Sequence, residues 1–300
     1  MTATRDAVSS IRDGTSAARD GTSEVREGMI VVEAGRYRLG SDAHYPEERP
    51  LREVEVRRFA IDRAPVTNRE FSEFARSTGY VTLAERAVPA GSAVFRMTAG
   101  PVDLRDPSSW WTFEPGASWR APDGPGSATD DRDDHPVVHV AYEDACAFAK
   151  WRGKRLPDEC EWEAAARDGL DAATYAWGDE LTPQGRMMAN FWTGAFPWYF
   201  ARGTPGTTAV GSFPPARSGA VDMIGNVWEW TRTPMHDPKP CGCTPPPLAG
   251  AAARDAMLVL KGGSWLCAAE YCARYRPAAR IALSAESTTA HVGFRCAIDL

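Results

Sequence analysis

Two cysteines near the C-terminal end stand at a spacing that could bind a metal ion. Cys267 and Cys272 lie five positions apart in the segment KGGSWLCAAEYCARYRPAAR, residues 261–280, and can meet across a turn. Soft thiolate ligands select Cu(I) or Zn(II), and two sulfurs alone suit a low-coordinate Cu(I) better than tetrahedral zinc. Nearby positive charge favours the thiolate form, and three arginines follow the pair: Arg274, Arg276 and Arg280.

The same spacing also fits two buried core cysteines or a disulfide, and spacing alone leaves these alternatives open. A zinc site lacks a second Cys/His pair at a suitable distance. Cys146 and Cys160 lie on helical patterns and Cys296 on a terminal strand, so we expect them to be core residues. The pair Cys241-Gly-Cys243 is too tight for ordinary chelation, and we expect it to be incidental.

A second set of donors lies in the segment DMIGNVWEW, residues 222–230. Asp222, Asn226 and Glu229 offer hard oxygens, and Gly225 permits a tight turn on which carbonyls can converge. Calcium prefers such mixed carboxylate and carbonyl ligands. The alternative is a turn that is capped by its own side chains.

Other residues that could take part in catalysis or metal binding fit structural roles better. His135 and His139 lie on either side of an apolar run, and we expect them to be hydrogen-bonded structural residues. We expect Glu159 and Glu161 to lie on a solvated helix face. The sequence contains no nucleophile elbow, phosphate-binding loop or dinucleotide fingerprint.

The composition indicates the class of protein in which these sites lie. The chain has 300 residues, 43% hydrophobic content and a formal net charge of -6, which is typical of a globular protein. Acidic residues outnumber basic ones and no Lys/Arg run occurs, so a nucleic-acid partner is not expected. No apolar stretch has the length of a membrane span, and the N-terminus lacks a signal-peptide core, so we expect a cytoplasmic protein whose seven cysteines are thiols.

The first 28 residues form a polar, Gly-bearing repeat of seven residues. A coiled coil needs two apolar positions per heptad and no regular glycine. We therefore predict a disordered tail over residues 1–28 and a folded domain over residues 29–300.

Short elements must position the candidate sites. Thr67 and Glu70 form a capping-box pattern that opens a helix ending at Gly79. Two further helices are predicted at 142–151 and from Asp158 to about Gly169. Strands are predicted at 54–61, 135–140 and 293–300, and residues 86–134 predict a long irregular excursion. The pattern indicates an α+β fold with a large irregular fraction.

Several longer segments resemble the formylglycine-generating (sulfatase-modifying factor) family. LPDECEWEAAARDGL, YAWGDE, GNVWEWT, KGGSWLC with YCARYRPAAR, and GFRCA occur in this order with the family's spacing. WWTFEPGASWRAPDGPGS and the paired cysteines are more specific to the generating enzymes themselves. The resemblance covers about residues 29–300.

The resemblance implies a fold and an activity. The fold would be a single α+β domain, distantly related to C-type lectins. Cys267 and Cys272 match the cysteines that hold Cu(I), where O2 is reduced and a substrate cysteine becomes Cα-formylglycine. The partner would be an unfolded sulfatase segment or peptide of the form Cys-x-Pro-x-Arg, bound in an extended groove by a protein that we expect to be monomeric.

The resemblance also assigns roles to single residues. Ser264 lies where the family has an active-site hydroxyl, and Arg276 and Arg280 match arginines that maintain the site. A structural calcium ion would be held by Asp222, Gly225, Val227 and Glu229. A second calcium site would begin at Asn190 and Phe191, but the stretch 201–204 offers no carboxylate, so we expect weak or no calcium there.

This chain departs from the family pattern at two places. Ala268-Ala269-Glu270 replaces the usual His-Arg-Ser, and His291 replaces an asparagine before the GFR segment. Both border the expected copper site and predict an altered rate or substrate preference. One alternative is a catalytically silent paralogue that binds a peptide or protein. An iron-dependent sulfoxide synthase is not favoured, because residues 1–28 contain no histidine and are too short for its helical domain.

Overall fold

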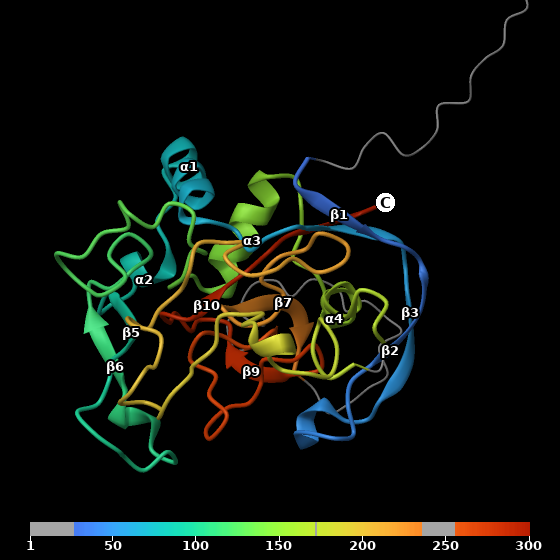
Figure 1. The fold of residues 1–300 in the computed structure, drawn as a ribbon. Coiled ribbons are helices and arrows are strands. Elements are labelled where there is room, and N and C mark those ends of the chain that lie inside the picture. The colour runs from blue at the N-terminus through green and yellow to red at the C-terminus, as the bar shows by residue number, and fades with distance from the viewer. Residues whose placement is uncertain (1–26, 172, 236–255) are drawn as a thin grey trace, which may run out of the picture.

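A computed structural model describes residues 27–171, 173–235 and 256–300 (Figure 1). The predicted tail therefore lies outside the described residues except for its last two positions. Cys241 and Cys243 also lie outside them.

A small antiparallel sheet joins the first and last strands of the described chain. Its strand order is β1-β4-β11, and Ile61 of the central strand pairs with Ile30 on one side and Ala297 on the other. Both ends of the described chain therefore lie against one strand, as the position of the C-terminus beside β1 shows in Figure 1. The strands are β1 (Met29–Val32), β4 (Phe59–Asp62) and β11 (Ala297–Asp299).

A four-stranded sheet forms the centre of the molecule, with the order β10-β7-β8-β9. The pair β10 and β7 is parallel, and the other two pairs are antiparallel. The cysteine-bearing segment 262–279 connects two neighbouring strands of this sheet, β8 and β9. The strands are β7 (Trp228–Pro234), β8 (Met257–Lys261), β9 (Arg280–Ser284) and β10 (Val292–Gly293).

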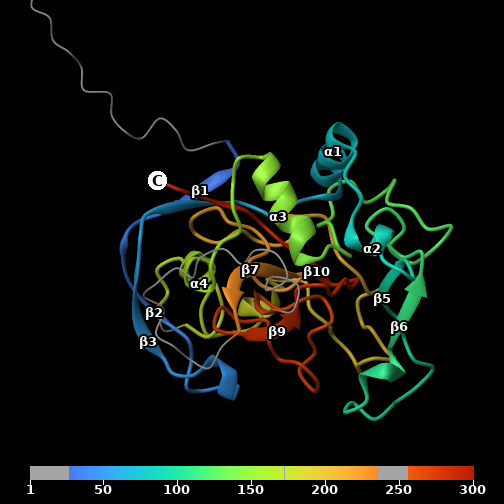
Figure 2. The ribbon, with the colours of Figure 1, turned by 180° about the vertical axis from the view of Figure 1, so that it is seen from behind.

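Two hairpins flank this central sheet on opposite sides, as both views show (Figures 1 and 2). One pairs β2 (Gly35–Leu39) with β3 (Arg52–Val56), and the 3-10 helix η1 (Pro46–Glu48) lies in its connection. The other pairs β5 (Gly91–Phe95) with β6 (Trp111–Pro115). Two more 3-10 turns, η2 (Pro107–Ser109) and η3 (Pro183–Gly185), lie in loops.

Three of the four α-helices in the described residues begin where the sequence predicts, and the short helix at 83–86 was not predicted. In α1 (Asn68–Thr78) the Thr67 hydroxyl accepts from the Glu70 amide and the Glu70 carboxylate accepts from the Thr67 amide, and the helix ends at Gly79. Asp158 caps α4 (Glu159–Arg167) in the same way. The remaining helices are α2 (Leu83–Arg86) and α3 (Tyr142–Trp151). The expected α+β fold with a large irregular fraction is confirmed.

Three predicted elements differ from the structure. Residues 54–61 form parts of two strands, because the chain changes pairing partner at Arg57 and Arg58, between β3 and β4. The run 135–140 is buried but is no strand, since the Val137 amide bonds to Val66 and the His139 amide to Thr289. The last strand is likewise divided into β10 and β11.

The excursion 86–134 is also less irregular than expected, because the β5–β6 hairpin lies within it. A further correction concerns the predicted solvated face of α4. Glu159 and Glu161 are buried: Glu161 forms a bidentate ion pair with Arg155, and Glu159 pairs with Arg280.

The described cysteines correct one expectation. Cys146, Cys267, Cys272 and Cys296 are free thiols. Cys160 packs in the core as expected but is disulfide-bonded. Within the described ranges, no helix has the length and apolar character that a membrane span requires.

Candidate active site

The turn between β8 and β9 brings the two candidate cysteines together. The Cys267 amide donates to the Ser264 carbonyl at 3.0 Å, and the Cys272 amide donates to the Ala268 carbonyl at 2.8 Å. These bonds fold the segment back on itself, so that the Sγ atoms of Cys267 and Cys272 lie 3.3 Å apart. A disulfide bond is about 2.05 Å long, so the pair is two adjacent free thiols.

The two sulfurs have different surroundings. Cys267 is 1% exposed, and burial raises the pKa of its thiol. A hydrogen bond from Cys267, together with the nearby Arg274, lowers the pKa of Cys272 to about 7. The Nη1 atom of Arg274 lies 3.7 Å from the Cys272 sulfur. The arrangement therefore favours a proton on Cys267 and a thiolate at Cys272.

Ser264 belongs to the same turn. Its amide donates to the Cys267 sulfur at 3.4 Å, and its hydroxyl oxygen accepts from the Leu266 amide at 3.3 Å. The side chain is fully buried. The structure thus places Ser264 directly beside Cys267, as the sequence predicts.

Residues in and next to η1 hold the Arg274 side chain in position. Its guanidinium lies 3.7 Å from the centre of the Tyr45 ring, and the Glu47 carboxylate accepts from Nε at 3.0 Å and from Nη2 at 2.5 Å. The Tyr45 hydroxyl also accepts from the Ala273 amide at 3.2 Å. This contact holds the backbone next to Cys272.

The two arginines that the sequence singles out lie behind the sulfurs rather than against them. Arg276 forms two hydrogen bonds of 2.6 Å with the Glu48 carboxylate, and both side chains are buried. Arg280 donates to the Glu47 carbonyl and pairs with Glu159. Among the described residues, Arg274 is the arginine that hydrogen-bonds a site sulfur.

An aromatic cluster borders the cysteine turn. The Trp192 amide donates to the Cys267 carbonyl at 3.0 Å. The Phe196 ring stacks on Tyr271 with centroids 4.8 Å apart, and Trp110 meets Tyr271 edge-on at 5.2 Å. Tyr271 is 36% exposed, so an apolar surface opens next to Cys272.

The two departures from the family pattern lie around this cluster. The Glu270 carboxylate accepts from the Phe196 amide at 2.7 Å. His291 packs against Trp111 with ring centroids 4.8 Å apart, and burial lowers its pKa to about 3. His291 is therefore neutral near pH 7. His139 bonds to Ser92 at 2.7 Å and His135 to Thr207 at 3.0 Å, so the expected structural roles of both histidines agree with the geometry.

The first predicted calcium site is only partly compatible with a metal ion. Both carboxylate oxygens of Glu229 are bonded to Arg295, and one of them also accepts from the Trp162 indole. Asp222 has one oxygen bonded to the Gly211 amide, and its other oxygen is buried without a partner. Burial raises the pKa of Asp222 to about 6. Asp222 can serve as a ligand, whereas Glu229 is engaged by an arginine.

The backbone around Gly225 is closely packed. Its amide donates to Gly262 at 2.9 Å, and a Cβ at this position would lie 2.3 Å from the Asn190 carbonyl oxygen. The next amide, that of Asn226, donates to the same Asn190 carbonyl at 2.8 Å. The segment with Val227 thereby packs against the start of the second predicted site. There, Asn190 and Phe191 accept hydrogen bonds from Arg202.

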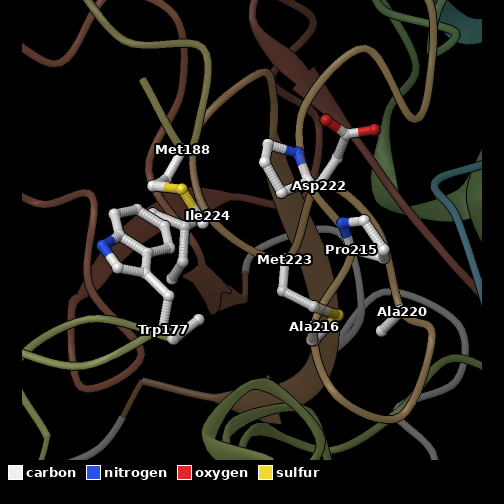
Figure 3. A pocket seen from close by; sticks show the side chains of 10 residues that line it. Trp177, Met188, Pro215, Ala216, Ala220, Asp222, Met223 and Ile224 are labelled. Atoms are coloured by element: carbon white, nitrogen blue, oxygen red, sulfur yellow. The ribbon is translucent and has the colours of Figure 1, made fainter. Parts of the chain in front are cut away.

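A small pocket lies apart from the cysteine pair (Figure 3). Trp177, Met188 and Ile224 stand on one side of it and Pro215 on the other, and the Asp222 carboxylate points away from Trp177. Its volume of about 30 Å³ is well below the ~300 Å³ of a ligand pocket. The pocket is therefore too small for a peptide substrate, and the exposed ring of Tyr271 beside Cys272 is the more suitable contact.

Sequence reasoning missed the residues that hold the site from a distance. Tyr45, Glu47 and Glu48 precede their partners by more than 220 positions. The sequence feature that could have indicated them is the pair of adjacent glutamates in the segment YPEERP, residues 45–50, whose charge is opposite to that of the arginines at 274 and 276.

Comparisons with known proteins identify the family to which this fold belongs. A family model described as "Sulfatase-modifying factor enzyme 1-like domain" matches residues 16–300. The chain is 51% identical over 292 residues to a formylglycine-generating enzyme of Mycobacterium tuberculosis, covering 90% of this chain and 97% of that protein. A formylglycine-generating enzyme of Thermomonospora curvata is 45% identical, with 90% and 93% covered.

Two further similarities show that membership of the family does not by itself establish activity. A bovine protein named inactive C-alpha-formylglycine-generating enzyme 2 is 39% identical, with 90% of this chain and 87% of that protein covered. The solved structure of PvdO from Pseudomonas aeruginosa superposes with a TM-score of 0.61 at 23% identity, covering 91% of this chain and 94% of PvdO. The latter likeness supports the fold alone.

Proposed function

Because this chain belongs to the sulfatase-modifying factor family of formylglycine-generating enzymes, we propose that it oxidises the cysteine of a Cys-x-Pro-x-Arg segment in a sulfatase to Cα-formylglycine. Cu(I) would be held by Cys267 and Cys272, and O2 would be the electron acceptor. The observation that carries the proposal is the pair of free thiols 3.3 Å apart, with Arg274 against the Cys272 sulfur.

The donor set fits a soft, low-coordinate ion. No group of three or more Cys, His, Asp or Glu side chains in the described part of the chain could hold a metal, so the site would offer two sulfurs only. Such a set suits Cu(I) better than zinc or calcium. When bound there, Cu(I) supplies a thiophilic, redox-active centre that can accept a third sulfur, that of the substrate.

The protein's own residues would prepare and shield this centre. Arg274 supports the thiolate of Cys272, and Tyr45 and Glu47 hold Arg274 in place. The exposed ring of Tyr271, held from behind by the buried rings of Phe196 and Trp110, offers an apolar contact for the proline of an extended peptide.

The overall chemistry balances without a further protein group. Two hydrogens leave the Cβ–Sγ unit of the substrate cysteine and give a thioaldehyde, and O2 takes up the two protons and two electrons as hydrogen peroxide, or is reduced to water when an external thiol supplies two more electrons. Water then replaces the sulfur with oxygen, which leaves the aldehyde and hydrogen sulfide.

The test is an anaerobic Cu(I) titration of the wild-type chain, Cys272→Ser and Cys146→Ser. We expect one tightly bound copper in the wild type and in the control, because Cys146 is a free thiol on α3 outside the site, and none in Cys272→Ser. Incubation of a Cys-x-Pro-x-Arg peptide with O2 should then give the mass at which SH and H are replaced by one carbonyl oxygen. Peptide binding without copper binding would instead support a silent binding module.

A further inference from the structure

Arg202 donates hydrogen bonds to the two residues that were expected to begin the second calcium site. Its Nη2 atom lies 3.0 Å from the Asn190 side-chain oxygen and 2.7 Å from the Phe191 carbonyl oxygen. Its Nε atom donates to the Thr193 hydroxyl at 3.3 Å. The guanidinium therefore faces three neutral oxygens from one short segment.

Within the described residues, no carboxylate forms an ion pair with Arg202, which is exposed, whereas the buried Arg167, Arg276 and Arg295 each have one. The side chain instead lies over the rings of Phe200 and Phe213, with centroids 5.2 and 5.8 Å away. An amide oxygen, a backbone carbonyl and a hydroxyl are the kinds of neutral ligand that a bound cation uses. The guanidinium thus occupies the place of a cation.

A calcium ion cannot share these oxygens with the guanidinium. Calcium binds oxygen at about 2.3–2.6 Å and requires six to eight ligands, several of them usually carboxylates. The stretch 201–204 provides Arg202 and no acidic residue. The residues at this site therefore do not fit calcium.

The segment that Arg202 holds continues to the cysteine turn. Asn190 is buried and donates through Nδ2 to the Gly206 carbonyl at 2.9 Å. Two residues further along, the Trp192 amide donates to the Cys267 carbonyl at 3.0 Å. A cation at Asn190 and Phe191 consequently orders the backbone that supports Cys267.

We propose that Arg202 is a built-in cation that replaces a divalent metal at the Asn190–Phe191 site and positions Trp192 against Cys267. The order of this segment is then independent of calcium. Arg202 acts here as a positioning residue and touches neither sulfur.

The test compares Arg202→Gln, which removes the charge, with Arg202→Asp, which supplies the missing carboxylate. Thermal unfolding is measured in chelator and in excess Ca²⁺, and amide exchange is followed in the peptide that contains Trp192. Loss of a charged hydrogen-bond donor should lower the Tm of both variants in chelator by roughly 3–8 °C. Calcium should restore the Tm and slow the exchange in Arg202→Asp but not in Arg202→Gln.

Arg217→Asp is the matched control, because it makes the same change in charge at another exposed arginine, one that forms no side-chain hydrogen bond or ion pair within the described residues. It should retain the wild-type Tm and gain no calcium response, and Arg202→Asp should bind one more Ca²⁺ than Arg217→Asp in a calorimetric titration. Three results would overturn the proposal: a wild-type Tm in Arg202→Gln, an equal calcium response of both Arg202 variants, or no calcium response of Arg202→Asp. Arg202→Lys, which keeps the charge, should lie between the wild type and Arg202→Gln.

Discussion

Cys267 and Cys272 are chemically unequal although they are neighbours in one turn. The raised pKa of the buried Cys267 thiol makes it the hydrogen-bond donor to Cys272, and the Arg274 guanidinium also contacts the Cys272 sulfur. Cys272 is thereby the sulfur that carries negative charge near neutral pH. A difference of this kind can be measured without any metal, because only the thiolate is alkylated rapidly.

In metal-free protein, alkylation of Cys272 by iodoacetamide should rise with pH around a midpoint of about 7. The lowered pKa means that the thiolate is present above this pH and is lost below it. Arg274→Gln should raise the midpoint, and each unit of increase leaves about tenfold less thiolate at pH values below both midpoints. Peptide mass spectrometry gives the rate at each residue.

Cys146 is the internal control for this experiment, because burial raises the pKa of its thiol to about 11. It should remain unmodified over the same pH range. An unchanged profile in Arg274→Gln would show that Arg274 does not set the charge of Cys272.

The sequence pointed to the residues that we propose carry the chemistry, but not to the residues that hold them in place. Cys267, Cys272 and Ser264 lie within nine positions, so their meeting in one turn follows from local spacing. Tyr45 and Glu47 lie more than 220 positions away. Without the tertiary fold, nothing links an acidic residue in one loop to a particular arginine in another.

At the level of elements, η1 and the cysteine segment are joined by a buried ion pair. Glu48 and Arg276 are both almost fully buried and share two hydrogen bonds of 2.6 Å. Removal of one partner leaves the other charge buried without compensation, which is far more costly than loss of a surface pair.

Glu48→Gln should therefore lower the free energy of unfolding by about 3–5 kcal/mol, as measured by urea denaturation. Glu55→Gln is the matched control, because Glu55 pairs with Arg36 at the surface, where the side chains are 81% and 72% exposed. It should cost at most about 1 kcal/mol. Equal costs in the two variants would contradict a structural role for the buried pair.

Local signals predicted the helices well and the strands poorly. The capping boxes at Thr67 and Asp158 are complete within four residues, so the helix starts could be read directly. The run 135–140 was buried as predicted, but its backbone partners come from two unrelated segments, which no alternation of apolar residues reveals. Glu159 and Glu161 were wrongly placed in solvent because their arginine partners lie on other elements or loops.

For the whole molecule, the β1-β4-β11 sheet closes the chain on itself. The last strand pairs along β4, and Arg155 forms an isolated bridge with Ala297. Asp299 also pairs with Arg155. Residues 297–299 consequently cover the edge of β4 and are part of the folded core.

Deletion of residues 297–300 should expose the edge of β4 and abolish cooperative unfolding, as followed by circular dichroism on heating and by size-exclusion chromatography. Deletion of Leu300 alone should leave the Tm unchanged, because this residue is exposed and lies beyond β11. A cooperative transition at the wild-type Tm in the longer deletion would show that β11 is dispensable.

The contact of Glu47 with Arg274 also has a consequence for the order of events during protein synthesis. The two residues are 227 positions apart, and a ribosome adds about 5–20 residues per second, so the carboxylate is synthesised roughly 10–45 s before its arginine. During that interval no part of the nascent chain can give Cys272 its acidity, because the thiol itself has not yet been made. The acidic thiol thus arises only when this later-made segment docks onto one made more than 220 residues earlier, and its reactivity records that docking step.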